Sequence, residues 1–304
     1  MSAHGHHHHH GHHHHHAHGA PNGDWRYGLA IVLNLVFVAI EATFGFLSNS
    51  TALLADAGHN LSDVLSLVLA GGAAWLARRP GAEQRTYGFG KATILAALTN
   101  GVVLVFACGA IALEAVQRFQ HPPSVQPTVI MAVAGAGFVL NLATALLFLK
   151  GREHDVNMKG AFLHMAADAG VSLAVVGAGV LIALTGRAWI DPAASLLVVA
   201  VVLIGTWELL KESLNLAMDT APANVRVGEV RAFLGGLPGV TGVHDMHIWN
   251  LSTTETALTA HLVREEAADN AFLTVAMGEL RSRYGIRHAT LQVEVGPQDH
   301  CAIC

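Results

Sequence analysis

Two pairs of side chains of types that can bind metal ions lie within apolar segments of the chain, each a histidine followed four residues later by an aspartate. The first pair is His59 with Asp63, in ALLADAGHNLSDVLSLVLAG, and the second is His164 with Asp168, in HMAAD. An offset of four places both members of a pair on one face of a helix, about one turn apart. Two imidazoles and two carboxylates are a donor set for tetrahedral Zn²⁺. The spacing therefore predicts a zinc site shared by two helices.

Ionisable side chains inside a membrane span are costly and indicate a functional site. The alternative is that each pair forms an internal hydrogen bond that ties helices together, which explains one such pair more readily than two matched pairs. Asp56 lies three residues before His59. We interpret Asp56 as an interfacial or helix-start residue that lies outside the site.

Six apolar segments contain and surround these pairs, and each is close to the ~20 residues that span a bilayer as a helix. Only 13% of the residues are charged, whereas a soluble domain has about 25%. We therefore expect an all-α transmembrane domain of six helices in a lipid bilayer. The segments run over 27–47, 53–77, 92–117, 128–149, 160–184 and 190–210.

The orientation follows from the lysines and arginines of the short connections, which accumulate on the cytoplasmic side. With a cytoplasmic N-terminus, nine of them lie inside and only Arg118 and Arg187 lie outside. Both termini are then cytoplasmic. The two histidine–aspartate pairs fall in the middle members of two three-helix halves that run in opposite directions, a pattern typical of inverted repeats with a site at their interface. The nine inner residues are Arg26, Arg78, Arg79, Arg85, Lys91, Lys150, Arg152, Lys159 and Lys211.

The apolar runs stop after Lys211, and residues 220–297 are typical of a small soluble domain. VRVGEVRAFLGGLPGV and NAFLTVAMGELRSRYG are predicted helices, while GVHDMHIWNLS, TALTAHLVRE and HATLQVEV are predicted strands. The order αββαβ indicates a two-layer α+β unit with both helices on one face of a three-stranded sheet. The predicted domains are a tail over 1–24, a transport domain over 25–211, a cytoplasmic domain over 212–297 and a second tail over 298–304.

The N-terminal tail, residues 1–24, holds twelve of the 21 histidines in a segment too polar to form a core. Clustered neutral imidazoles bind borderline metals weakly and reversibly. We interpret this tail as a metal-gathering segment, and an expression tag is the alternative. The formal net charge of −5 gives no basic domain that would track nucleic acid phosphates, so no nucleic acid partner is expected.

Five motifs together resemble a known family. LLADAGHNLSDVLSL, EQRTYGFGK, HMAADAGVSL, WIDP and GVHDMHIWNLSTTE are similar to segments of the cation diffusion facilitators, in particular the bacterial zinc exporters and their vesicular animal relatives. The resemblance covers about residues 25–295. It implies a homodimer of six-helix protomers, each with a ferredoxin-like cytoplasmic domain. It also implies export of Zn²⁺ from the cytoplasm in exchange for protons, across the inner membrane of a bacterium.

The resemblance places the family's transport site on His59, Asp63, His164 and Asp168. Members with a histidine at the first of these positions are associated with zinc preference, and members with an aspartate there accept cadmium more readily. A further exposed metal site of some members lies in the loop ARRPGAEQRTYGFGK, which here has no histidine and one acidic residue. We therefore expect that exposed site to be absent.

The resemblance also places a cytoplasmic Zn²⁺ site on the predicted strands. By position it falls on His244 and His261, with Glu294 and His288 from the last strand. Strand alternation puts His244 and His247 on opposite faces, so a regular strand does not bring both to one cluster. His247 is therefore interpreted as a packed histidine.

Three cysteines complete the candidate ligands. Cys301 and Cys304 form a CxxC next to a histidine, and in a reducing cytoplasm such a pair is typical of metal-binding thiolates. The alternative is a frayed tail that contacts nothing. Cys108, which lies alone in the third span, is interpreted as a small buried hydrophobe.

The sequence lacks the motifs of two other classes of protein, ATP-driven pumps and metalloproteases. YGFGKAT lacks the upstream glycine and the Ser/Thr of a phosphate-binding loop, and the HExxH motif of a metalloprotease is absent. The chain is therefore expected to be neither an ATP-driven pump nor an enzyme. A passive divalent-metal channel or importer, and a membrane metal sensor, remain the alternatives to an exporter.

Overall fold

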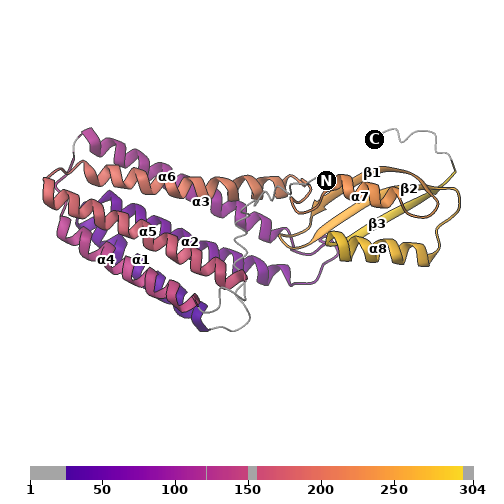
Figure 1. Cartoon of the computed structure of the whole chain (residues 1–304), viewed down its shortest axis with the longest axis horizontal. Helices are drawn as coiled ribbons and strands as arrows, with labels where there is room; N and C mark the ends of the chain where they lie inside the picture. The colour runs from indigo at the N-terminus through magenta and orange to yellow at the C-terminus, as the bar shows by residue number, and fades with distance from the viewer. Residues whose placement is uncertain (1–24, 121, 150–155, 297–304) are drawn as a thin grey trace, which may run out of the picture. The chain divides into compact units, whose positions relative to one another are not determined.

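All six apolar segments form helices in the computed structural model, which describes residues 25–120, 122–149 and 156–296 (Figure 1). In these ranges five helices are long and apolar enough to cross a bilayer, and the first contributes a shorter apolar helix, Val32–Leu47. The predicted helical transmembrane region is confirmed. The helices are α1 (Trp25–Leu47), α2 (Thr51–Ala77), α3 (Ala92–Gln120), α4 (Pro127–Phe148), α5 (Val156–Thr185) and α6 (Ile190–Ala217).

Helix α6 continues well past the predicted end of the last apolar segment at residue 210 and ends at Ala217. The added sequence, KESLNLA, is rich in good helix formers but too polar to register as a membrane span. The apolar pattern marks only the part of a helix that lies in the apolar core of the bilayer. A polar end of the same helix continues beyond it without a sequence signal. The expected boundary after Lys211 therefore falls inside a continuous helix.

The chain divides into two compact units. The first consists of Met1–Val64 and Cys108–Ala200, and the second of Leu65–Ala107 and Val201–Cys304. In the first unit α4 packs along α5 and also contacts α1 (Figure 1). Gly137 of α4 permits this approach, because a Cβ there would lie 2.6 Å from Phe37 Cζ and 3.3 Å from Ser172 Oγ.

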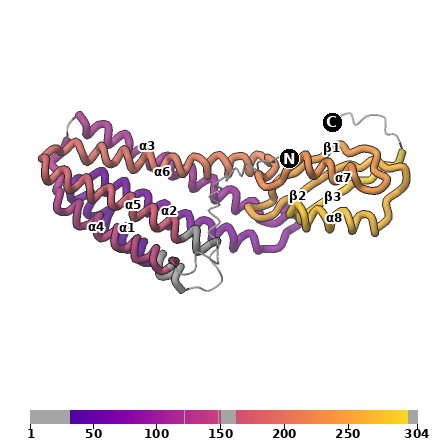
Figure 2. The backbone as a smooth tube through the Cα atoms, viewed as in Figure 1, coloured from indigo at the N-terminus to yellow at the C-terminus, as the bar shows by residue number. Residues whose placement is uncertain are grey.

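The second unit contains the small α+β domain, whose predicted αββαβ order is confirmed. Strand β2 lies between the other two strands, antiparallel to β1 and parallel to β3 (Figure 2). The parallel pairing of β2 with β3 requires a crossover, which α8 provides. The elements are α7 (Val227–Gly235), β1 (Val240–Asn250), β2 (Thr256–Arg264), α8 (Asn270–Tyr284) and β3 (Ile286–Val295).

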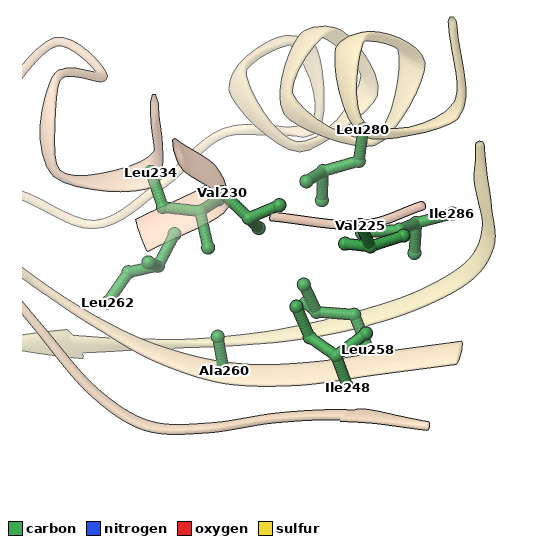
Figure 3. Close-up of a cluster of buried hydrophobic side chains, with 9 residues drawn as sticks. All are labelled: Val225, Val230, Leu234, Ile248, Leu258, Ala260, Leu262, Leu280 and Ile286. Atoms are coloured by element: carbon green, nitrogen blue, oxygen red, sulfur yellow. The ribbon is translucent and has the colours of Figure 1, made fainter. Parts of the chain in front are cut away.

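Both helices of this domain cover the same face of the sheet (Figure 3). Leu258, Ala260 and Leu262 alternate along β2 and pack with Leu234 of α7 and Leu280 of α8. Full burial of a leucine side chain stabilises a fold by about 1.5–3 kcal/mol, so this layer is a major source of the domain's stability. The strict alternation leaves the intervening β2 residues on the opposite face, which the helices do not cover.

Candidate metal centres

The start of α2 is fixed by an acidic side chain from a distant part of the sequence. Asp191, in the first turn of α6, accepts hydrogen bonds from Ser50 Oγ at 2.5 Å, Thr51 N at 2.7 Å and Thr51 Oγ1 at 2.8 Å. Its carboxylate therefore caps the N-terminus of α2, where backbone N–H groups otherwise lack partners. Because His59 and Asp63 follow within four turns, this cap sets their position in the membrane domain.

The two histidine–aspartate pairs converge in the first unit. His59 Nε2 lies 3.1 Å from Asp168 Oδ1 and 3.9 Å from Asp63 Oδ2. His164 Nε2 lies 3.5 Å from Asp63 Oδ2 and 3.7 Å from Asp168 Oδ2. Each imidazole thus lies within 4 Å of both carboxylates.

These separations match those of a metal site. Ligand atoms at about 2.0–2.2 Å from a tetrahedral zinc ion lie about 3.3–3.6 Å from one another. The four nitrogen–oxygen distances bracket that range, from 3.1 to 3.9 Å. The ligand atoms of His59, Asp63 and Asp168 already lie within 4.8 Å of one another. Movement of the His164 side chain toward these three would complete the set of four donors. The arrangement therefore suits a small divalent cation with nitrogen and oxygen ligands.

Burial distinguishes the four side chains. Asp168 is 2% exposed, while His59, Asp63 and His164 are 17–21% exposed. Among the described residues, Asp63 Oδ2 and Asp168 Oδ2 are buried oxygens without a hydrogen-bond partner. Unpaired buried acceptors are costly, and a bound cation would satisfy both.

A second polar group lies beside this site, and the sequence analysis missed it. Glu41 of α1 and Asp56 of α2 are fully buried, together with Asn60 of α2 and Ser172 of α5. The interpretation of Asp56 as an interfacial or helix-start residue was wrong. Helix α2 begins at Thr51, so Asp56 already lies more than one turn inside it. A glutamate in an otherwise apolar helix was the signal that could have revealed the group.

Three of the predicted cytoplasmic ligands meet on the sheet face opposite α7 and α8. Glu294 of β3 lies between two imidazoles, with Oε2 3.0 Å from His244 Nε2 and Oε1 2.7 Å from His261 Nδ1. The ligand atoms of these three residues lie within 4.8 Å of one another. Two nitrogens and a carboxylate fit Zn²⁺ and leave room for a fourth ligand.

A bulge in β1 shapes this cluster and changes the role of His247. The pairing of β1 with β2 shifts register between His244 and His247, and Asp245 adopts φ = 45°. This turn directs Asp245 toward the cluster, with Oδ2 3.6 Å from His261 Nε2. The interpretation of His247 as packed was wrong, because its side chain is 66% exposed and contacts Asp245 Oδ1 at 2.9 Å. Extra residues at a bulge break the alternation on which that interpretation depended.

Two carboxylates of the cluster have lowered pKa values. Burial alone would raise the pKa of Glu294, but hydrogen bonds from His244 and His261 and the charge of these imidazoles outweigh burial and lower it. The pKa of Asp245 is lowered chiefly by its hydrogen bond with His247. Both groups are therefore ionised at neutral pH, the form that binds cations.

The structure does not bring His288 to the cluster. His288 lies on β3 six residues before Glu294, which separates them by about 20 Å along an extended strand. Its ring instead meets the ring of Tyr87 edge-on, with centroids 5.4 Å apart. Cys108 is buried and has a free thiol, as expected. The histidine-rich tail over 1–24, Cys301 and Cys304 lie outside the described residues.

Comparison with known proteins identifies the family. The sequence profile described as "Cation efflux transmembrane domain" matches residues 28–216, and the profile "Cation efflux protein, cytoplasmic domain" matches residues 222–295. The chain belongs to the cation efflux family, and the resemblance to cation diffusion facilitators is confirmed. It is an integral membrane protein of a family of metal cation transporters, with a helical membrane region followed by a small α+β domain.

Bacterial transporters are among the similar proteins. "Cadmium, cobalt and zinc/H(+)-K(+) antiporter" of Bacillus velezensis is 34% identical over 278 residues, which are 90% of this chain and 88% of the relative. "Metal cation efflux system protein CzcD" of Cupriavidus metallidurans is 34% identical over 283 residues, 92% of this chain and 90% of the relative. "Zinc transporter ZitB" of Escherichia coli is 36% identical over 264 residues, 86% of this chain and 84% of the relative.

Proposed function

We propose that this protein exports Zn²⁺ from the cytoplasm in exchange for protons, through the site formed by His59, Asp63, His164 and Asp168. The observation that carries the proposal is the convergence of the two pairs, in which each imidazole lies within 4 Å of both carboxylates. Helices α2 and α5 each contribute one pair. A movement of one helix relative to the other therefore changes the distances between the two pairs of ligands.

The donor set favours zinc as the substrate. Imidazole nitrogen and carboxylate oxygen in a tetrahedral arrangement suit Zn²⁺, while larger and softer ions prefer other ligands and spacings. Two of the relatives described above carry zinc in their names. The name of the first relative also includes cadmium and cobalt, so the choice between these ions depends on the first histidine and on the size of the site.

Proton exchange follows from the chemistry of the same four side chains. A metal ion binds the deprotonated forms of histidine and aspartate, so zinc and protons compete for one site. A site that faces the cytoplasm binds zinc, and the same site facing outward releases it and takes up protons. The inward proton gradient then drives zinc outward. The first relative's name describes an antiporter that uses protons.

The proposed setting is the inner membrane of a bacterium, with both chain ends in the cytoplasm. The excess of lysine and arginine on one side of the membrane supports that orientation. The tail over residues 1–24 then gathers zinc on the side from which zinc is exported.

The cytoplasmic domain is proposed to bind zinc as a regulator and to hold two protomers together as a homodimer. Its cluster of His244, His261 and Glu294 fits a zinc ion by donor type and spacing. Cys301 and Cys304 follow Glu294 by seven to ten residues, and extended chain reaches about 3.3 Å per residue. The tail is therefore long enough to supply thiolates to this cluster or to that of a partner. Ligands drawn from two chains make zinc binding favour the dimer.

Zinc uptake into proteoliposomes that hold the purified full chain tests this function. With the cytoplasmic face outward and the interior acidic, uptake should exceed the uptake seen without a pH gradient, and the interior should lose protons. A channel or importer would equilibrate zinc without moving protons. A metal sensor would bind zinc and transport none.

A further inference from the structure

The buried polar group next to the metal site has an unusual distribution of donors and acceptors. Asn60 Nδ2 donates a hydrogen bond to Glu41 Oε2 at 3.1 Å, and Ser172 Oγ donates one to Asp56 Oδ2 at 3.0 Å. Among the described residues, the second oxygens, Glu41 Oε1 and Asp56 Oδ1, are buried and receive no donor. The two carboxyl groups themselves lie within hydrogen-bond reach of each other.

Two ionised carboxylates cannot form that contact. An ionised carboxylate accepts hydrogen bonds only, whereas a protonated one donates one. Two negative charges in contact away from water repel each other strongly, and such pairs hold a shared proton instead. One proton between Glu41 and Asp56 satisfies the oxygens that have no other donor and removes one of the two charges.

No lysine or arginine of the surrounding helices takes the place of this proton. The apolar part of α1 from residue 32 to 47, the whole of α4 and the part of α5 from 162 to 185 contain no lysine or arginine. The ionisable side chains that act electrostatically on Asp56, besides Glu41, are His59 on the same helix and Asp168 on α5. Both belong to the proposed metal site.

We propose that Glu41 and Asp56 form a proton-binding site that holds one shared proton and gives it up during the transport cycle. The proposal rests on the proton exchange proposed above and names a carrier for a proton other than the metal ligands. Asn60 follows His59 directly, and Ser172 lies one turn beyond Asp168. The helices that carry the metal ligands therefore also carry the two groups that hold the carboxyl pair in place.

This placement couples the two sites. A movement of α2 and α5 that changes access to the metal site also exposes the carboxyl pair to water. Proton loss there converts one carboxylic acid and one water molecule into a carboxylate and a hydronium ion. The two carboxylates then repel each other, which separates α1 from α2, and rebinding of a proton brings them back together.

Infrared difference spectroscopy of the purified full-length protein tests the bound proton directly. At neutral pH and without metal, the wild type should have a C=O stretching band of a buried carboxylic acid that shifts slowly in D₂O. Glu41→Gln and Asp56→Asn keep size and hydrogen-bonding capacity, and either change should remove the band. The control Glu114→Gln removes an exposed carboxylate that pairs with Arg118, and it should leave the band unchanged.

Proteoliposomes with a zinc dye and a pH dye then test the role in exchange. Glu41→Gln and Asp56→Asn should bind zinc within about threefold of wild type but move about one proton fewer per zinc ion, because the substituted pair binds none. A wild type that transports zinc without protons overturns the proposed exchange and this proposal together. Wild-type coupling that both variants retain in full overturns only the role of the pair. A wild type without the carboxylic acid band also overturns the role of the pair. If K⁺ or Mg²⁺ then stabilises that protein against unfolding, the unpaired oxygens of Glu41 and Asp56 bind a cation and not a proton.

Discussion

Replacement of Asp191 by alanine tests how α2 is held in position. The carboxylate is 1% exposed and accepts hydrogen bonds from the Ser50 hydroxyl, the Thr51 hydroxyl and the Thr51 backbone N–H. Loss of a helix cap costs about 0.5–2 kcal/mol, and a buried donor left without an acceptor costs about 1–3 kcal/mol. The two hydroxyls can rotate toward other acceptors, so mainly the backbone N–H stays unpaired. We therefore expect Asp191→Ala to lower the free energy of unfolding by about 1.5–5 kcal/mol, the sum of these two costs.

The measurement is unfolding in mixed micelles by increasing SDS, followed by far-UV circular dichroism. Asp191→Asn retains the shape and one carbonyl acceptor, so about half of the loss is expected, since one oxygen still accepts hydrogen bonds. The control Glu212→Gln changes an exposed carboxylate of the same helix and should stay within about 0.5 kcal/mol of wild type. An unfolding free energy of Asp191→Ala within about 1 kcal/mol of wild type would refute the cap as the anchor of α2, because caps and buried donors cost more than that.

Further predictions concern the metal ligands and the two tails. Asp63→Ala should abolish zinc flux in protein that still folds and inserts, and wild-type flux would contradict the assigned site. His59→Asp should raise cadmium flux relative to zinc flux, because a carboxylate replaces an imidazole. An unchanged flux ratio would show that other features of the site set the choice of ion. Deletion of residues 2–20 should preserve the maximal rate and raise the zinc concentration for half-maximal flux, whereas an inserted but inactive protein would make the tail part of the mechanism. Cys301→Ser combined with Cys304→Ser should weaken zinc binding by the cytoplasmic site, and equal affinity would leave the tail without a role.

Short-range sequence patterns predicted the features that depend only on neighbouring residues, namely helical spacing, apolar segments and the order of helices and strands. The spacing of His59 and Asp63 is set by one helical turn, and the same is true of His164 and Asp168. The apolar segments and the αββαβ order follow from hydrophobic periodicity, which the structure confirms. The convergence of the two pairs needs α2 and α5 to lie side by side, which no local pattern specifies.

Contacts between distant segments could not be predicted from the sequence. The cap of α2 comes from Asp191, about 140 residues further along the chain. The Glu41–Asp56 pair depends on how α1 packs against α2. In the small domain, the bulge before His247 reverses the face on which that residue was expected, since one extra residue shifts all that follow. His288 stays outside the cluster because six residues of extended strand separate it from Glu294.

X-ray absorption spectroscopy of zinc bound to the full-length protein tests the central claim most directly. The protein carries replacements that remove the cytoplasmic ligands, so that only the membrane site binds zinc. The spectrum should contain four nitrogen or oxygen ligands at about 2.0–2.2 Å, with outer scattering from two imidazoles. Asp168→Ala should abolish the bound zinc or change that shell. A shell with sulfur, six oxygen ligands or no imidazole, or a spectrum that Asp168→Ala leaves unchanged, would contradict the assignment. The cytoplasmic replacements are His244→Ala, His261→Ala, Cys301→Ser and Cys304→Ser, together with deletion of residues 2–20.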